Sequence, residues 1–215
     1  LILLKKVLKY TKNMNQLFDK IDRQLENIAN NNIANNITNN NIINKGTGAG
    51  GSNTNKNGLN YEEITCLYNI LDIIDTKTVF GSGVNDYYYI YKNYKILKQH
   101  GLCKYLLNEY DECERKMNPD ECILDTDNHI IYIMEKKFQQ TPGSVDEKIQ
   151  SAPFKMYYYN EMYPKYKIVY IYVLSDWFKN KKYDPERRYY ESLVNIFMLY
   201  GSDANYIKKL LEIIE

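Results

Sequence analysis

Three side chains near the middle of the chain have the types and the spacing that metal-assisted hydrolysis requires. They are the acids Asp120 and Glu135 and, two residues beyond the second acid, Lys137. Two carboxylates that face each other repel unless a cation lies between them, and oxygen ligands of this kind suit Mg²⁺. A lysine beside the cation can orient or deprotonate water, or neutralise charge on a phosphate. The trio therefore has the parts for metal-assisted hydrolysis of a phosphodiester.

A β-hairpin is the element that must bring these side chains together. Residues 121–125 and 130–138 are predicted strands, and residues 126–129 are predicted to form the turn between them. Whether the loop holds two or four residues, the residue numbers of each cross-strand pair add up to 255, so the register is the same in both cases. Asp120 then lies directly opposite Glu135, with Cβ atoms about 4.5–5.5 Å apart.

Alternation along the strands decides which charged residues can meet. Side chains of a strand point to opposite faces in turn, so Glu135 and Lys137 share one face and Lys136 points to the other. Asp125 also faces away, which favours Asp120 as the second acid. Isoleucines share the face of the acids, and a buried acid pair without a cation would be costly. The alternative from the residues alone is a solvated, charged face of an ordinary hairpin.

The flanking sequence divides the chain into three parts. Residues 1–28 repeat apolar residues at spacings of three and four, which predicts an N-terminal helix with one apolar stripe. Residues 29–58 are rich in Asn and Gly and bury too little apolar surface to offset the entropy of ordering, so we expect a disordered linker. Residues 59–215 hold every tyrosine except Tyr10 and are expected to form the folded domain.

This folded part is expected to be an α/β domain with a mixed central sheet flanked by helices. Residues 167–174 are almost continuously apolar, as in a strand that is buried on both faces. The predicted order is two helices, two strands, a helix, a strand and two helices. The helices are expected at about 60–75, 86–108, 145–162, 185–199 and 203–214.

Composition excludes several classes of protein. No apolar run approaches the ~20 residues that a membrane-spanning helix needs, and the apolar start is too short for a signal peptide. The four cysteines form no CxxC pair, so we expect reduced thiols in an intracellular protein of the cytoplasm or nucleus that is not secreted. With 28 basic against 27 acidic residues, any binding to nucleic acid must depend on local basic patches.

A family resemblance rests on the same hairpin. Pro119-Asp120, followed after fourteen residues by Glu135-Lys136-Lys137, resembles the PD-(D/E)xK motif of the restriction-endonuclease-like nuclease superfamily. The longer strings Glu135–Gln150 and Tyr170–Phe178 are similar to type II restriction endonucleases in particular, and the likeness spans about residues 58–205. It implies a restriction-endonuclease-like core in which Asp120 and Glu135 are metal ligands and Lys137 is the catalytic lysine.

The resemblance also implies supporting residues. In many such enzymes a glutamate on the first core helix reaches the metal, and Glu62 and Glu63 are equal candidates here. Their alternative role is simply to favour the first turn of that helix. Gln139, two residues beyond Lys137, could bond water or phosphate, or be a solvated glutamine at the strand end.

Several further residues are candidates for contact with DNA. Ser144 lies in a turn before a predicted helix, where backbone N–H groups can receive a phosphate. Lys148 and Lys155 are seven residues apart and share one face of that helix, and Lys181 and Lys182 belong to a basic cluster after the buried strand. The alternatives are a plain turn and cap for the serine, and ordinary surface lysines for the others.

Together these features predict a Mg²⁺-dependent endodeoxyribonuclease, most like a sequence-specific type II restriction enzyme. Its partners would be double-stranded DNA and a second copy of the chain, because a homodimer mirrors the two-fold symmetry of a palindromic site. Two other hypotheses remain open. One is a structure-selective repair or junction nuclease of the same fold, and the other is a non-catalytic oligomeric module that binds DNA or protein.

Overall fold

The computed structural model describes residues 52–215 except 72, 74–76, 107–116 and 141–144, and the structural statements below concern those residues. The chain divides into two units between Asn55 and Lys56. The predicted helix at 1–28 and most of the predicted linker lie outside the described residues. Helix α2 (Ser52–Ile64) begins inside the linker range, so residues 52–58 are helical and that part of the linker prediction is wrong.

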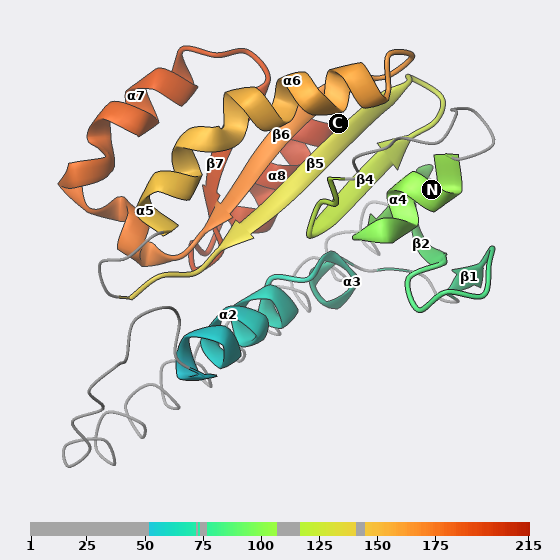
Figure 1. Ribbon diagram of the computed structural model, residues 1–215, viewed down its shortest axis with the longest axis horizontal. Coiled ribbons are helices and arrows are strands. Elements are labelled where there is room, and N and C mark those ends of the chain that lie inside the picture. Colours follow the sequence, from blue (N-terminus) through green and yellow to red (C-terminus); the bar gives the residue numbers. More distant parts are fainter. Residues whose placement is uncertain (1–51, 72, 74–76, 107–116, 141–144) are drawn as a thin grey trace, which may run out of the picture. The chain divides into compact units, whose positions relative to one another are not determined.

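The second unit is built on a seven-stranded mixed sheet in which the strands follow one another in sequence order (Figure 1). Strands β1 to β5 pair antiparallel, whereas β5, β6 and β7 pair parallel. The strands are β1 (Thr78–Val79), β2 (Tyr87–Tyr91), β3 (Tyr94–Lys98), β4 (Glu121–Asp125), β5 (Ile130–Lys137), β6 (Lys167–Leu174) and β7 (Ile196–Tyr200).

Helices pack on both faces of this sheet, which confirms the predicted α/β class. In Figure 1, α6 crosses in front of β5 and β6, and α8 lies behind the sheet. On the α8 side, the hydroxyls of Tyr94 and Tyr132 donate to the carbonyl of Ile214, at 2.8 and 3.4 Å. The other helices are α3 (Leu67–Ile70), α4 (His100–Leu106), α5 (Val145–Lys148), α6 (Ala152–Met162), α7 (Asp184–Glu191) and α8 (Tyr206–Ile214), with 3-10 turns η1 (Ile149–Ser151), η2 (Asp176–Lys179) and η3 (Lys181–Tyr183).

The main hydrophobic core lies between the sheet and α6. Tyrosine supplies much of it, because Tyr159, Tyr170, Tyr172 and Tyr190 are each at most 1% exposed. Seven of the eight residues of β6 are buried, as the apolar run predicts for a strand covered on both faces. No helix in the described part of the chain is both long and apolar enough to cross a membrane.

The hairpin β4–β5 has the predicted register. Glu121 pairs with Met134 and Asp125 pairs with Ile130, so paired numbers sum to 255. A buried side chain closes the turn: Asp125 accepts hydrogen bonds from the backbone N–H groups of residues 127 and 128 at 3.1 and 3.0 Å, and from the Asn128 side chain at 2.8 Å. The turn chemistry therefore fixes which residues of the two strands face each other.

The predicted helix at 86–108 is wrong over most of its length. Residues 87–98 form the hairpin β2–β3, and within the described part of the predicted range (86–106) the helical residues are His100–Leu106. Aromatic side chains favour the pleated, half-buried surface of a sheet, and five of the residues in this segment are tyrosines. Lys92 has φ 54°, a left-handed backbone conformation that suits the tight turn between the strands.

Three other helix predictions are corrected in extent. The segment at 60–75 is broken between Ile64 and Leu67, where α2 ends and α3 begins. The segment at 145–162 contains a 3-10 turn before α6. The helix at 185–199 ends at Glu191, and β7 follows as a third parallel strand at the edge of the sheet.

Candidate active site

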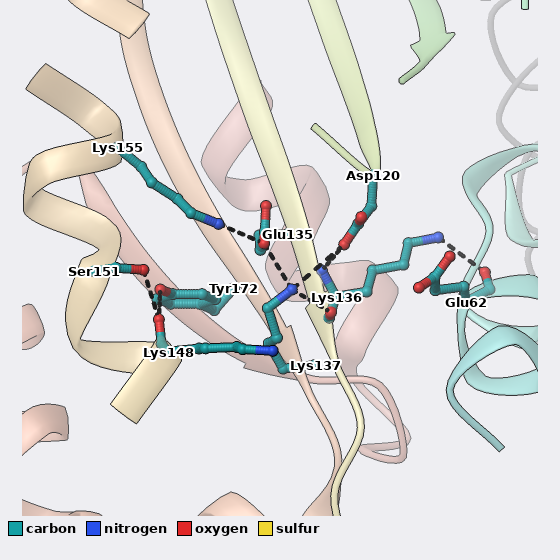
Figure 2. Close-up of polar contacts among 9 residues, drawn as sticks. All are labelled: Glu62, Asp120, Glu135, Lys136, Lys137, Lys148, Ser151, Lys155 and Tyr172. Carbon is teal, nitrogen blue, oxygen red and sulfur yellow. Dashed lines mark hydrogen bonds and ion pairs between the residues drawn. The ribbon is translucent and has the colours of Figure 1, made fainter. Parts of the chain in front are cut away.

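Asp120, Glu135 and Lys137 meet on the face of the sheet that α6 covers (Figure 2). The Nζ of Lys137 lies 2.6 Å from Glu135 Oε1 and 3.9 Å from Asp120 Oδ2. Asp120 immediately precedes β4, and its Oδ2 accepts a hydrogen bond of 2.7 Å from the backbone N–H of Lys136. The hairpin register thus brings the two acids together with the lysine between them.

A second lysine reaches the same acid. Lys155, on α6, lies with its Nζ 2.6 Å from Glu135 Oε1. Lys155 is a predicted candidate for contact with the DNA backbone, but its side chain points into the acid cluster and is only 21% exposed. Two ammonium groups therefore share one carboxylate oxygen of Glu135.

The acids of this cluster respond differently to their surroundings. Burial raises the pKa of Asp120, and the negative charge of Glu135 raises it further. Burial also acts to raise the pKa of Glu135, but Lys137 and Lys155 outweigh it and leave that pKa below its ordinary value. Burial thus disfavours the charged form of Asp120, whereas the two lysines hold Glu135 ionised.

The structure separates the two glutamates of α2. Glu62 is half-buried, and its carboxylate points toward Asp120 (Figure 2). Burial raises the pKa of Glu62, and the charge of Asp120 is the next cause. The side chain of Glu63 is exposed, and its backbone carbonyl accepts a hydrogen bond from the Asn69 side chain at 2.9 Å. Glu62 is therefore the glutamate that α2 directs at the acid cluster.

The opposite face of the same hairpin carries a buried ion pair that sequence reasoning missed. Lys136 and Glu121 lie 2.7 Å apart, and each side chain is 2% exposed. Glu121 also accepts from the Cys66 thiol at 2.6 Å and from the Leu67 backbone N–H at 3.1 Å. Burial raises the pKa of Cys66 to about 12, so the thiol keeps its proton and can donate. The register contained the signal, because Glu121 pairs with Met134 and is diagonal to Lys136 on one face.

The remaining predicted residues lie around the cluster or outside it. Gln139 is buried just beyond β5, where its backbone N–H and carbonyl bond the Ser175 hydroxyl at 3.1 and 3.0 Å. Ser144 lies outside the described residues.

The lysines predicted to contact DNA differ in position. Lys148 is exposed, and its carbonyl accepts from Tyr172, the strand partner of Glu135, at 3.1 Å. Lys181 and Lys182 are exposed on η3, where the Lys182 ammonium lies 4.9 Å from the centre of the Trp177 ring. These three side chains therefore keep the solvent exposure that phosphate contacts require.

The chemistry of the acid cluster fits a hard divalent cation. No group of three or more His, Cys, Asp and Glu side chains within the described ranges is close enough to hold a metal in this conformation. Mg²⁺ nevertheless needs only one or two carboxylates, since it keeps several waters. Asp120 and Glu135 supply two such oxygen donors, and Lys137 and Lys155 hold the pKa of Glu135 below its ordinary value, so that this carboxylate is ionised.

Comparison with known proteins finds a structural likeness but no sequence family. No family model matches the chain, and no curated protein matches it. Among solved structures, the chain is similar to the MunI restriction endonuclease in complex with cognate DNA, with 14% sequence identity and a TM-score of 0.36. The alignment covers 56% of this chain and 78% of that chain. A TM-score of this size is too low to establish a function.

Proposed function

We propose that this chain is a Mg²⁺-dependent endodeoxyribonuclease with a restriction-endonuclease-like core, and that it cuts double-stranded DNA at specific sequences as a type II restriction enzyme does. One observation carries the proposal. Two opposed acids, Asp120 and Glu135, share a face with Lys137, whose ammonium lies 2.6 Å from one and 3.9 Å from the other. This is the arrangement that the PD-(D/E)xK resemblance implies.

The residues divide the work by their chemistry. Asp120 and Glu135 would hold the cation, with Glu62 as a further acid beside them. When bound, Mg²⁺ supplies Lewis-acid stabilisation of the charge that develops on the phosphate. Lys137 would orient the attacking water through its ammonium, or take up the proton of that water once it has itself lost one. Lys155 helps keep Glu135 ionised, which is the state in which a carboxylate can bind a cation.

The partners of the proposed enzyme follow from its substrate. Exposed Lys148, Lys181 and Lys182, with the turn at Ser144, would contact phosphates of the duplex. A homodimer would place two such sites across a two-fold axis, as cutting both strands of a palindrome requires. We place the enzyme inside the cell, in the cytoplasm or nucleus, where the free thiols of Cys66, Cys103 and Cys122 would remain reduced.

The direct test is cleavage of a plasmid of known sequence, with Mg²⁺ and with excess chelator. We expect discrete fragments only with Mg²⁺. Lys137→Ala should reduce the cleavage rate by about 10²-fold or more, because a positioned acid or base contributes about 10²–10⁴-fold. Lys208→Ala is the matched control, because Lys208 is 68% exposed on α8 and pairs only loosely, at 3.8 Å, with Glu212.

Each outcome distinguishes the competing hypotheses. Discrete fragments from linear duplex support a sequence-specific enzyme. Cleavage confined to branched substrates would identify the structure-selective nuclease instead. DNA binding without Mg²⁺-dependent cleavage, unchanged by Lys137→Ala, would identify a non-catalytic module and refute the proposed active site.

A further inference from the structure

The buried pair Lys136–Glu121 occupies the junction between two helices. The Lys136 ammonium, 2.7 Å from Glu121, also donates to the Glu62 carbonyl in the last turn of α2, at 3.0 Å. The Glu121 carboxylate accepts the backbone N–H of Leu67, the first residue of α3, at 3.1 Å. The cation thus binds the C-terminal end of one helix, and the anion binds the N-terminal end of the next.

Both contacts satisfy backbone groups that a helix leaves unpaired at its ends. Two other carbonyls in the last turn of α2 have local partners. The Tyr61 carbonyl accepts from Thr65, and the Glu63 carbonyl accepts from the Cys66 N–H and the Asn69 side chain. The Glu62 carbonyl, by contrast, is held from the sheet, by a lysine whose own side chain is 2% exposed.

The bond from Lys136 fixes the backbone of Glu62, whose side chain is directed toward the acids on the other face of the hairpin. Lys136 and Glu135 are neighbours on β5 and point to opposite faces. Lys136 donates to the carbonyl of Glu62, and the Glu62 carboxylate points toward Asp120 (Figure 2). We propose that the Lys136–Glu121 pair is a positioning device that directs the Glu62 carboxylate toward Asp120. This inference rests on the proposed function, since it assigns Glu62 to the same cation.

A purely stabilising role accounts less well for this pair. A buried ion pair is weak evidence for stability, because the desolvation of two charges offsets much of their attraction, and apolar residues of similar volume often serve as well. An apolar side chain at position 136, however, could not hold the Glu62 carbonyl. The charged pair therefore does one thing that an apolar pair could not do: it fixes the C-terminal end of α2.

The test compares variants by Mg²⁺ binding in isothermal titration calorimetry without DNA, and by thermal unfolding without Mg²⁺. Lys136→Met removes the closest cation of the buried Glu121 carboxylate and leaves only Lys98, at 3.7 Å, so the protein should be less stable. The double variant Lys136→Met/Glu121→Gln removes both charges and should recover most of that stability. Its Mg²⁺ affinity should stay about tenfold or more below wild type, as is typical when a residue that orients a ligand is removed.

Two controls isolate the contact with Glu62. Lys98 is a second lysine beside Glu121, with its Nζ 3.7 Å from Glu121 Oε1. Its ammonium is paired with Glu121 and not with the Glu62 carbonyl, so Lys98→Met should leave the Mg²⁺ affinity unchanged. Lys136→Arg keeps a cationic donor and should retain most of the affinity. In a Glu62→Gln background, the Lys136→Met/Glu121→Gln change should cause no further loss, because the pair acts through Glu62.

Wild-type Mg²⁺ affinity in the folded double variant would overturn the inference, and so would a full additional loss in the Glu62→Gln background. Failure of the proposed function gives a different result. If Asp120→Asn also binds Mg²⁺ as the wild type does, the cation site itself is misplaced and the positioning role falls with it. If Asp120→Asn loses binding while the double variant keeps it, the cation site stands and only the positioning role is refuted.

Discussion

Glu135 is the acid of the site whose negative charge is neutralised by neighbouring lysines. One of its oxygens receives two ammonium groups, Lys137 from its own strand and Lys155 from α6. Across the hairpin, Asp120 receives a backbone N–H and a more distant ammonium, and its pKa is raised. Two neighbouring acids in contrasting environments allow one to remain ionised while the other gains most from an added cation.

Lys155→Met should lower the stability of the metal-free protein near neutral pH, by about 2 kcal/mol or less, because one charged hydrogen bond is lost and Lys137 remains. The pKa of Glu135 is lowered in the folded state, so its contribution to stability is present above the unfolded pKa and is lost as pH falls through the folded pKa. The difference between wild type and variant should therefore shrink on acidification. Urea unfolding across this pH range measures it, and a constant difference would contradict the assignment.

Sequence reasoning reached the three central residues of the site but not all of their neighbours. Register and alternation are local properties of one hairpin, and they predict that Asp120, Glu135 and Lys137 share a face, as they do in the structure. Lys155 comes from a helix on another layer, and nothing in its spacing shows that it turns inward to Glu135. The choice between Glu62 and Glu63 likewise depended on how the end of α2 meets the sheet.

At the scale of elements, close backbone approach constrains α4. A Cβ on Gly101 would lie 2.5 Å from the carbonyl oxygen of Asn85, in the segment that precedes β2. That oxygen belongs to the backbone, so it cannot move aside as a flexible side chain would. The start of α4 therefore depends on glycine to sit against the strand region.

A pair of helical glycines tests this constraint. Gly101→Ala should destabilise the protein by about 1–3 kcal/mol, as overpacking does. Gly58→Ala should instead stabilise it by about 0.5–1 kcal/mol, because Gly58 lies within α2 and a Cβ there meets nothing within 4 Å. Urea unfolding of both variants measures the difference. Equal effects of the two substitutions would contradict the packing of α4.

Elements with an unambiguous period were predictable, and elements with tyrosine-rich composition were not. The strands at 121–125 and 167–174 match the prediction at both ends, because alternation or continuous burial marks them. Residues 87–91 show neither the period of two of a strand nor the 3.6-residue period of a helix. Four of the five are tyrosines, which can lie on a buried or an exposed face. The strand at 196–200 was merged with the preceding helix, because no Gly or Pro marks the boundary.

For the whole molecule, the boundary at Asn55–Lys56 and the start of α2 indicate where a self-sufficient fold begins. A chain that starts at Ser52 should keep a cooperative thermal transition with a midpoint close to that of the full chain. A chain that starts at Thr65 lacks Glu62 and α2, so it should bind Mg²⁺ more weakly. Calorimetry of both truncations measures these effects, and loss of cooperativity in the longer one would show that residues 1–51 belong to the fold.

The turn at 126–129 has a consequence for how related sequences can diverge. Because Asp125 closes this turn and the register follows from it, insertion or deletion of one residue would turn the side chains of β5 to the opposite faces while those of β4 stayed in place. Lys136 would then stand among the acids of the site, and Glu135 would be buried against the helix junction. We therefore expect homologues to tolerate substitutions on this exposed loop while its length stays constant, in contrast to ordinary surface loops, where evolution freely adds and removes residues.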